Sequence, residues 1–221
     1  MKRFDSAQGY ESDIARVVPG HALLRQAAVC ELSSVARTGD RLGVVGPGPG
    51  QELPVLASAL PGVSIDAVEP SAPMAAACER RVQDLGLTSR ICVRRSALQA
   101  THPATWDLGL SLLVAHLIDA NGPDRRNYWT ALASHLRPGG VLVHGEISCL
   151  TAAELDAWAA YSASQGCDAE RVATLRERLT TGFSLLPWDV SVDLAHQAGL
   201  HVRRDVFRIW GLRLAVFERI V

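Results

Sequence analysis

Three glycines spaced two residues apart would let a ligand approach the polypeptide backbone closely. They are Gly46, Gly48 and Gly50, within "VVGPGPGQEL" after a valine-rich run. Glycine permits tight turns, and a glycine loop between a strand and a helix N-terminus is suited to hold a nucleotide. Glu69 ends the next apolar run, where an acid can accept hydrogen bonds from ribose hydroxyls. The alternative is a tight turn that binds nothing.

The spacing of these glycines decides which nucleotide the loop would hold. A dinucleotide site needs G-x-G-x-x-G. Counted from Gly46, the third glycine falls on Gln51, and counted from Gly48 it falls on Leu53. The pattern present is G-x-G-x-G, which is typical of S-adenosylmethionine (SAM) sites and argues against a nicotinamide enzyme.

The elements that must position this loop alternate between strand and helix. Short apolar runs predict strands at 42–45, 63–68, 91–93, 106–114 and 141–144. Helical spacing predicts helices at 21–37, 51–60, 72–85, 125–136, much of 151–180, and 190–198. The tail after Gly199 predicts two strands that turn near Trp210.

Strands and helices in alternation indicate an α/β fold with an open parallel sheet. We expect a Rossmann-like, doubly wound and mostly parallel seven-stranded sheet, with an antiparallel strand in a C-terminal hairpin and helices on both faces. Residues 1–221 would form a single domain. An N-terminal helical lid over about 1–38 and a helical insertion over about 150–188 would be added to its core.

The composition is that of a globular protein with little net charge. The chain has 221 residues, 48% of them hydrophobic, a mean hydropathy of +0.11 and a net charge of −1. A net charge close to zero argues against nucleic acid or an anionic membrane as a partner. Neither a secretory signal nor a membrane-spanning run is found, so we expect a cytoplasmic protein. Five cysteines without a C-x-x-C pair suggest buried free thiols and no metal site.

The sequence resembles the class I SAM-dependent methyltransferases over most of its length. "VVGPGPGQEL" is similar to the family's first motif, "IDAVEPSAPMAAAC" to its second-strand motif, and "ALASHLRPGGVLVHGE" to the helix, turn and fifth strand of its core. "RRSALQ" and "WDLGLSLLVAHLID" resemble its adenine-binding turn and fourth strand. The resemblance implies cofactor contacts from Gly46, Pro47, Gly48, Gly50, Glu69, Pro70, Met74, Ser96, Ala97, Ser111 and Leu112.

Two positions depart from the family pattern. The acid that usually precedes the first glycine by two residues, and holds the methionine amino group, is Val44 here. The acid that often meets the adenine amino group is Ser96. Glu52, or Tyr10 and Arg16 from a first helix that closes over the cofactor, are therefore expected to supply contacts to the methionine part. A surface helix that only packs is the alternative for that segment.

Methyl transfer from a sulfonium requires alignment and exclusion of water more than a signature catalytic group. His116 follows the fourth strand and is a candidate general base; the alternative is that it is a structural histidine. Tyr10 is a second candidate for a catalytic role. Glu146 ends the fifth strand, where it would touch the acceptor or remain a solvated loop acid. Trp158 and Tyr161 would line an acceptor pocket or belong to the core.

The sequence leaves several functions open. The first is a methyltransferase for a small organic molecule, as in secondary metabolism, either monomeric or as a homodimer. The second uses SAM itself as the substrate, in a cyclisation or lyase reaction that releases methylthioadenosine, or in carboxy-SAM synthesis; Val44 is the only hint of it. A non-catalytic SAM-binding module is the third, and a transfer RNA methyltransferase is disfavoured by the charge.

Overall fold

The computed structural model describes residues 10–100 and 105–220, and the side chains from residue 13 onward. Two helices, α1 (Tyr10–Val17) and α2 (His21–Ser33), precede the sheet. The strands are β1 (Arg41–Val45), β2 (Ser64–Val68), β3 (Ile91–Arg94), β4 (Trp106–Leu112), β5 (Leu136–Ile147), β6 (Leu200–Ile209) and β7 (Leu212–Arg219). The other helices are α3 (Leu53–Ala59), α4 (Ala72–Asp84), α5 (Asp124–His135), α6 (Ala152–Ser164), α7 (Ala169–Glu177) and α8 (Trp188–Gln197).

The seven strands form one sheet in the order β3-β2-β1-β4-β5-β7-β6. Strands β1 to β5 pair in parallel, and β7 lies antiparallel between β5 and β6. The predicted fold class is therefore confirmed, including the C-terminal hairpin, which turns at Trp210 with a positive φ of 52°.

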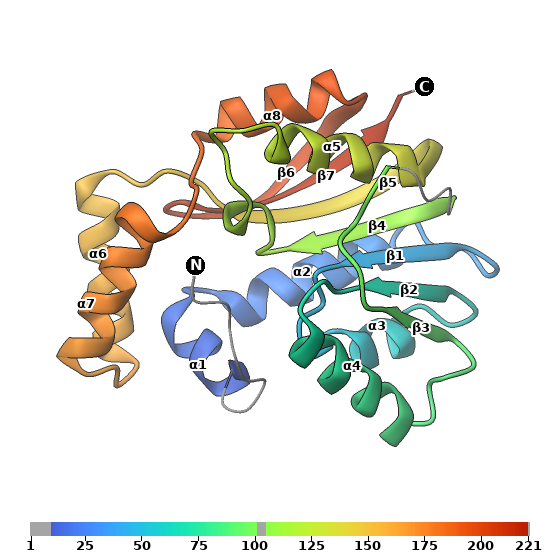
Figure 1. Cartoon of the computed structure of the whole chain (residues 1–221), viewed down its shortest axis with the longest axis horizontal. Coiled ribbons are helices and arrows are strands. Elements are labelled where there is room, and N and C mark those ends of the chain that lie inside the picture. The colour runs from blue at the N-terminus through green and yellow to red at the C-terminus, as the bar shows by residue number, and fades with distance from the viewer. Residues whose placement is uncertain (1–9, 101–104, 221) are drawn as a thin grey trace.

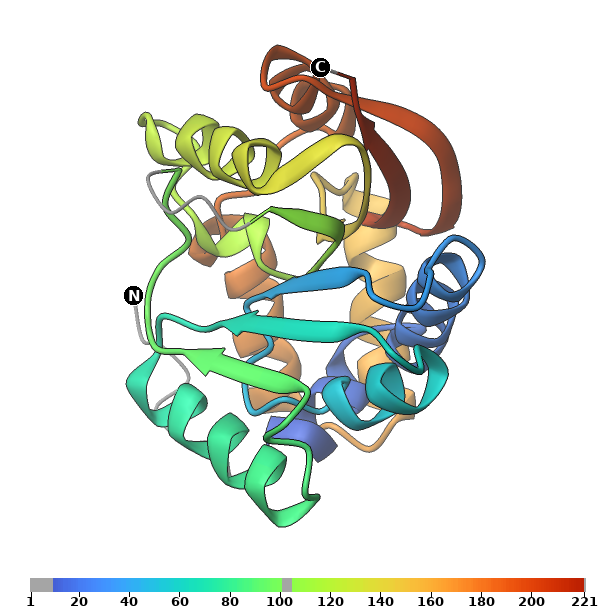
Figure 2. The same cartoon turned by 90° about the vertical axis from the view of Figure 1, so that its right-hand side faces the viewer.

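Helices cover both faces of the sheet, and each face has its own hydrophobic cluster. One cluster joins α2, α3 and α4 to the sheet, and the other joins α5 and α8 to it. In Figure 1 these two groups lie below and above the strands, and the view turned by 90° shows the same layers (Figure 2). Because β1, β2 and β4 are covered on both sides, their side chains are apolar almost throughout.

Close packing over β1 requires a glycine. A side chain on Gly43 would overlap the ring of Trp106, whose atoms lie 2.1 Å from where its Cβ would be. The indole Nε1 donates a 3.1 Å hydrogen bond to Asp66 on β2, and Asp66 pairs with Arg41 at 2.6 Å. These contacts fix the amino-terminal half of the sheet, away from the glycine loop.

Beyond the carboxyl ends of the parallel strands lie α1, α6 and α7 (Figure 1). Thr151 and Glu154 form a capping box that starts α6, and the Asp168 side chain accepts from the Arg171 backbone to start α7. A five-residue π-helical turn, 178–182, follows α7. Helical structure between β5 and α8 was predicted, and these added helices cover the edge of the sheet where ligands bind in such folds.

Two expectations need correction. The segment 137–140 was predicted to be a turn before a strand at 141–144, but β5 already begins at Leu136, since the backbone there pairs with Trp106 across an irregular register. The cysteines were expected to be buried; all five are free thiols, but only Cys78 is buried. Cys30 of α2, Cys92 of β3 and Cys149 in the loop after β5 are exposed.

Candidate functional site

The glycine loop between β1 and α3 has the geometry of a ligand-binding turn. Gly46, Gly48 and Gly50 all have positive φ, at 67°, 56° and 78°. A Cβ on Gly46 would meet Val114 at 2.4 Å and one on Gly50 would meet Cys78 at 2.8 Å, whereas above Gly48 nothing lies within 4 Å. Packing therefore explains two of the glycines, and the third opens onto free space.

Glu69 connects this loop to the end of β2. Its Oε2 accepts a 3.0 Å hydrogen bond from the Gly48 backbone N–H, and its Oε1 accepts one of 2.8 Å from Ser71. Burial raises the pKa of the carboxyl, and these two hydrogen bonds partly oppose that rise. Each carboxylate oxygen keeps a second lone pair, so Glu69 can hold the loop and still accept from a ligand hydroxyl.

A small, open cleft lies between the loop, the first two helices and the end of β4. Its walls are Ile14, His21, Leu24, Arg25, Gly46, Pro47, Gly48, Pro49, Gln51, Glu52, Leu112 and Leu113. Leu113 has a φ of 60°, a conformation that costs a leucine about 1–2 kcal/mol and that often occurs at functional sites. The strained backbone of Leu113, the glycine loop and the charged side chains therefore all lie at this cleft.

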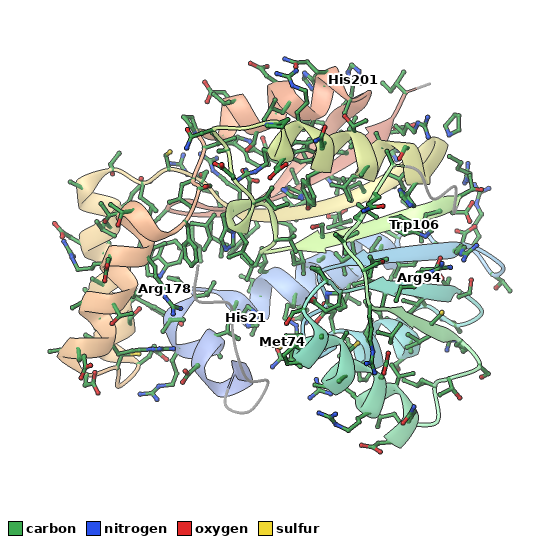
Figure 3. All side chains as sticks on the ribbon, viewed as in Figure 1. His21, Met74, Arg94, Trp106, Arg178 and His201 are labelled. Carbon is green, nitrogen blue, oxygen red and sulfur yellow. The ribbon has the colours of Figure 1, made fainter. Side chains whose placement is uncertain are left out.

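The charges in the cleft come from α2 and from the start of α3. Burial raises the pKa of the Glu52 carboxyl to about 7, and the nearby Arg25 guanidinium offsets part of the rise. Burial, together with Arg25, lowers the pKa of His21 to about 4, so this imidazole is neutral at physiological pH. Figure 3 shows His21 and Met74 near the carboxyl ends of the strands, whereas Trp106 lies toward the opposite end.

The structure brings some of the predicted cofactor residues together and not others. Pro47, Glu52 and Leu112 line the cleft with the glycines. Met74 is buried in the first turn of α4 but is not among the cleft residues. Pro70 and the predicted adenine contacts Ser96 and Ala97 are exposed after their strands, and their roles remain predictions.

Ser111 faces away from the cleft because successive residues of a strand point to opposite sides. Its hydroxyl is fully buried and lies 2.5 Å from the Tyr128 hydroxyl on α5. Leu112, the next residue, faces the cleft. The Ser111 side chain therefore makes a structural hydrogen bond, and its expected place beside the methionine part stays a prediction.

Arg16 also lies elsewhere than expected. Its Nε donates a 3.0 Å hydrogen bond to the Gln165 carbonyl, and a second nitrogen donates to Gly166, so it satisfies carbonyls at the end of α6 that have no partner within the helix. Trp158 donates from its indole to the Val17 carbonyl at 2.6 Å, and Arg171 pairs with Asp13 at 2.7 Å. These contacts fasten α1 to α6 and α7. The Tyr10 side chain lies outside the described residues.

Trp158 belongs to the core, as the more conservative interpretation held. It is fully buried and its ring packs against Trp210 at 6.2 Å.

His116 lies in a short 3-10 turn, 115–117, three residues beyond the cleft residue Leu113. The ring is 4% exposed and packs edge-on against Phe183 at 4.9 Å. Burial lowers its pKa to about 4, and Glu146 partly opposes this. Within the described part of the chain, Nδ1 is buried and has no hydrogen-bond partner. The ring is thus neutral and has a free polar atom.

Glu146 is neither a solvated loop acid nor exposed to an acceptor, because it is fully buried within β5. It accepts hydrogen bonds from Ser191 at 2.6 Å and from His144 at 3.2 Å, and Arg125 lies 3.8 Å away. Burial would raise its pKa, but these partners hold it below the ordinary value. His144 packs against Trp129 of α5.

Arg125 extends this buried network to two loops. It donates to the carbonyl of Ile118 at 3.1 Å, just beyond His116, and to that of Ser184 at 2.6 Å, just beyond the π-helical turn. One guanidinium therefore links α5, the turn that carries His116 and the end of the helical insertion. It fixes the position of His116 relative to the sheet.

Sequence reasoning missed Arg25, His21 and Gln51. His21 and Arg25 stand four residues apart, so they share a helix face, and that face lies just before the first strand. This spacing could have drawn attention to them. Within the described residues, no cluster of His, Cys, Asp and Glu is arranged to hold a metal ion, and no helix has the length and hydropathy needed to cross a membrane.

Replacing Glu52 by glutamine is expected to stabilise the ligand-free protein at neutral pH. Because its folded-state pKa of about 7 exceeds the ordinary 4.5, the folded protein retains a proton that the unfolded chain loses, and stability falls as pH rises through this window. After allowance for solvent screening, the gain should be about 1–2 kcal/mol above pH 7. Thermal melts should show higher stability for E52Q at pH 7.5 and equal stability near pH 4; identical melts at both pH values would contradict this.

Comparison with known proteins agrees with this geometry. Residues 44–142 match the family model of the methyltransferase domain. Among solved structures, the mitomycin 7-O-methyltransferase MmcR has 17% identity and a TM-score of 0.65, with 96% of this chain and 58% of that chain covered. An O-methyltransferase family protein from Burkholderia thailandensis has 16% identity and a TM-score of 0.69, with 95% and 58% covered.

A third similar structure is a geranyl diphosphate methyltransferase in complex with GPP and sinefungin. It has 14% identity and a TM-score of 0.66, with 90% of this chain and 78% of that chain covered. The present chain spans 58% of the length of the first two structures, and identities this low establish the fold alone. The sequence has no significant match among curated proteins.

Proposed function

We propose that this protein transfers a methyl group from SAM to a small organic molecule, because residues 44–142 match the family model of the methyltransferase domain and the fold is that of the similar methyltransferase structures. The observation that carries the proposal is the open space above Gly48, beside a carboxylate that bridges this glycine to the end of β2. A nucleoside bound there could approach the Gly48 backbone closely and donate hydrogen bonds from its ribose hydroxyls to the Glu69 carboxylate.

When bound, SAM would supply a methyl group already activated by its sulfonium. The glycine loop and Glu69 would hold the nucleoside, and Leu112 and Leu113 would pack beside the methionine part. The chain's task is then to orient the acceptor and to exclude water. His116, neutral at physiological pH, would accept the proton of a hydroxyl acceptor, held in place by Arg125 through Ile118.

Three features support a small acceptor. Helices α6 and α7 lie beyond the carboxyl edge of the sheet, over the side where an acceptor would bind (Figure 1). The net charge is −1, which gives no electrostatic attraction for nucleic acid. Two of the similar structures are enzymes whose names specify small molecules, mitomycin and geranyl diphosphate. A role in secondary metabolism, a cytoplasmic location and either a monomeric or a homodimeric state belong to this proposal.

The test is mass spectrometry of the purified protein with SAM, first alone and then with a panel of phenols, hydroxyquinones and carboxylic acids. A product heavier than its acceptor by one methylene, formed together with S-adenosylhomocysteine (SAH), would support the proposal. Methylthioadenosine released without any acceptor would replace it with a reaction that consumes SAM as substrate. Binding without turnover across a broad panel would favour the non-catalytic module.

Replacing Glu69 by alanine should weaken SAH binding by roughly 1.5–3 kcal/mol, because ribose hydroxyls would lose a charged partner and Gly48 would lose its bridge. Calorimetric titration would measure the loss. Asp84→Ala, at the exposed last residue of α4, is the matched control and should bind SAH normally. Equal affinity of E69A and the wild type would contradict the assignment.

Replacing His116 by glutamine should lower kcat by roughly 10²–10⁴-fold on a hydroxyl acceptor. Affinity for SAH should not change, since His116 is not among the residues that line the cofactor cleft. If kcat stayed within a factor of two of the wild-type value, His116 would be a structural histidine.

A further inference from the structure

A second cavity lies at the opposite end of α2 from the cofactor cleft. Its volume is about 170 Å³. For comparison, an engineered cavity of about 150 Å³ can hold benzene. The lining comes from the C-terminal end of α2, from β5 and from the hairpin strands: Glu31, Ser34, Val35, Val141, Arg203, Arg204 and Val216. Among the described residues, none lines both this cavity and the cofactor cleft, so the cavity is a separate place for a ligand about one ring in size.

The inner part of the cavity is apolar. Val141 of β5 and Val216 of β7 are 6% and 4% exposed and belong to the hydrophobic cluster on the α2 face of the sheet. Val35, just beyond α2, is half-buried and packs against the same cluster. Water makes few hydrogen bonds in a space lined by valines, so an apolar group is the better occupant of this part.

The outer part of the cavity carries two arginines. Their side chains, those of Arg203 and Arg204, are 53% and 59% exposed. Arg204 pairs with Glu31, and the Nε of Arg203 lies 3.5 Å from Glu218. A guanidinium has five N–H donors, and no described residue contacts the two terminal nitrogens of Arg203. These two nitrogens can hold a carboxylate through parallel hydrogen bonds.

An irregularity in β6 brings both arginines to the cavity. Successive residues of a regular strand point to opposite faces of a sheet. The pairing of β6 with β7 shifts register between Val202 and Arg204, which makes Arg203 an extra residue on its strand. Arg203 and Arg204 therefore line the same cavity although they are adjacent in the sequence.

We propose that this cavity binds a small organic carboxylate, with its apolar body against the three valines and its charge on the two arginines. A single negative charge fits better than a phosphate dianion, because Glu31 and Glu218 already offset part of the arginine charge. A cation is disfavoured, since it would lie beside two guanidinium groups.

The ligand would bind away from the cofactor and take no part in methyl transfer. His21 and Arg25, near the start of α2, line the cofactor cleft, whereas Glu31, in its last turn, lines the second cavity. The ten residues from His21 to Glu31 extend over about 15 Å of helix. The inference therefore goes beyond the proposed function and does not depend on it.

The test is an NMR titration of the isotope-labelled full chain with three probes. Benzoate has a ring and a carboxylate, benzyl alcohol has the ring without the charge, and acetate has the charge without the ring. Benzoate should bind at least about 10-fold more tightly than either of the others and shift the amide resonances of Val35, Val141 and Val216. Arg203→Ala should weaken benzoate binding about 10-fold or more, because a charged hydrogen bond is lost, and leave benzyl alcohol unchanged.

Arg208→Ala is the matched control, because Arg208 is an exposed, ion-paired arginine on the same strand but outside the cavity. It should bind benzoate like the wild type. Val35→Phe should fill the cavity and block benzoate and benzyl alcohol alike, and melting curves should confirm that each variant is folded.

Three results would overturn this assignment. They are no binding of benzoate to the wild type or binding no tighter than that of benzyl alcohol, unchanged benzoate affinity in R203A, and resonance shifts confined to the glycine loop. SAH affinity should be the same in R203A and the wild type, so the methyltransferase proposal stands or falls on its own experiments.

Discussion

Replacing Gly48 by leucine is expected to abolish measurable SAH binding while the protein remains folded. The new side chain would extend into the open space above Gly48, which is the space assigned to the nucleoside in the proposed function. The backbone at a φ of 56° adds strain of about 1–2 kcal/mol. We expect an affinity loss of more than about 100-fold, equivalent to roughly 3 kcal/mol.

Gly86→Leu is the matched control for this experiment. Gly86 has a φ of 66° and open space above it, but it lies beyond the C-terminus of α4 and not in the cleft. Both variants should lose a similar amount of stability, and only G48L should lose the ligand. Comparable SAH affinity for the two variants would show that the glycine loop does not contact the cofactor.

Replacing Arg125 by methionine is expected to destabilise the protein by about 3–5 kcal/mol. The substitution leaves the fully buried Glu146 without its cationic neighbour, and it deprives the carbonyls of Ile118 and Ser184 of a donor. Urea unfolding monitored by tryptophan fluorescence would measure the loss.

Two further variants separate charge burial from general damage to α5. The double variant R125M/E146Q should recover part of the loss, because no unpaired charge then remains in the interior. Arg126→Met, at an exposed neighbour on the same helix, should change stability by less than about 0.5 kcal/mol. If R125M were as stable as R126M, the Arg125–Glu146 pair would have no structural role.

The fold was predictable because its signals are local. Apolar runs with glycine or proline at their ends locate the strands of a parallel sheet to within a few residues, and "VVGPGPG" identifies the loop between β1 and α3. The C-terminal hairpin was recognisable from its two β-branched and aromatic runs around Trp210. For β5, the sequence pattern predicted too late a start, because pairing with β4 extends the strand through a proline–glycine stretch.

The direction in which each side chain points could not be predicted from local sequence patterns. Arg16 and Arg25 are nine residues apart in the same N-terminal region; the sequence pointed to Arg16, whereas Arg25 is the one that lines the cleft. The packing of α1 on α6 decides the outcome, since it brings Arg16 to carbonyls 149 and 150 residues away. Glu146 was similarly misjudged, because its partners come from α5 and α8 and no sequence spacing relates them to it.

Under the proposed function, the contacts that fasten α1 to α6 and α7 would link the access of the cofactor to the access of the acceptor. Ile14 of α1 forms part of the cofactor cleft, while Asp13 and Val17 bind the helices over the edge of the sheet. A movement of α1 that opened the cleft would therefore also disturb the cover of the acceptor side. An acceptor bound beneath α6 and α7 would hinder that movement, so we expect the cofactor to bind before the acceptor and S-adenosylhomocysteine to leave after the methylated product.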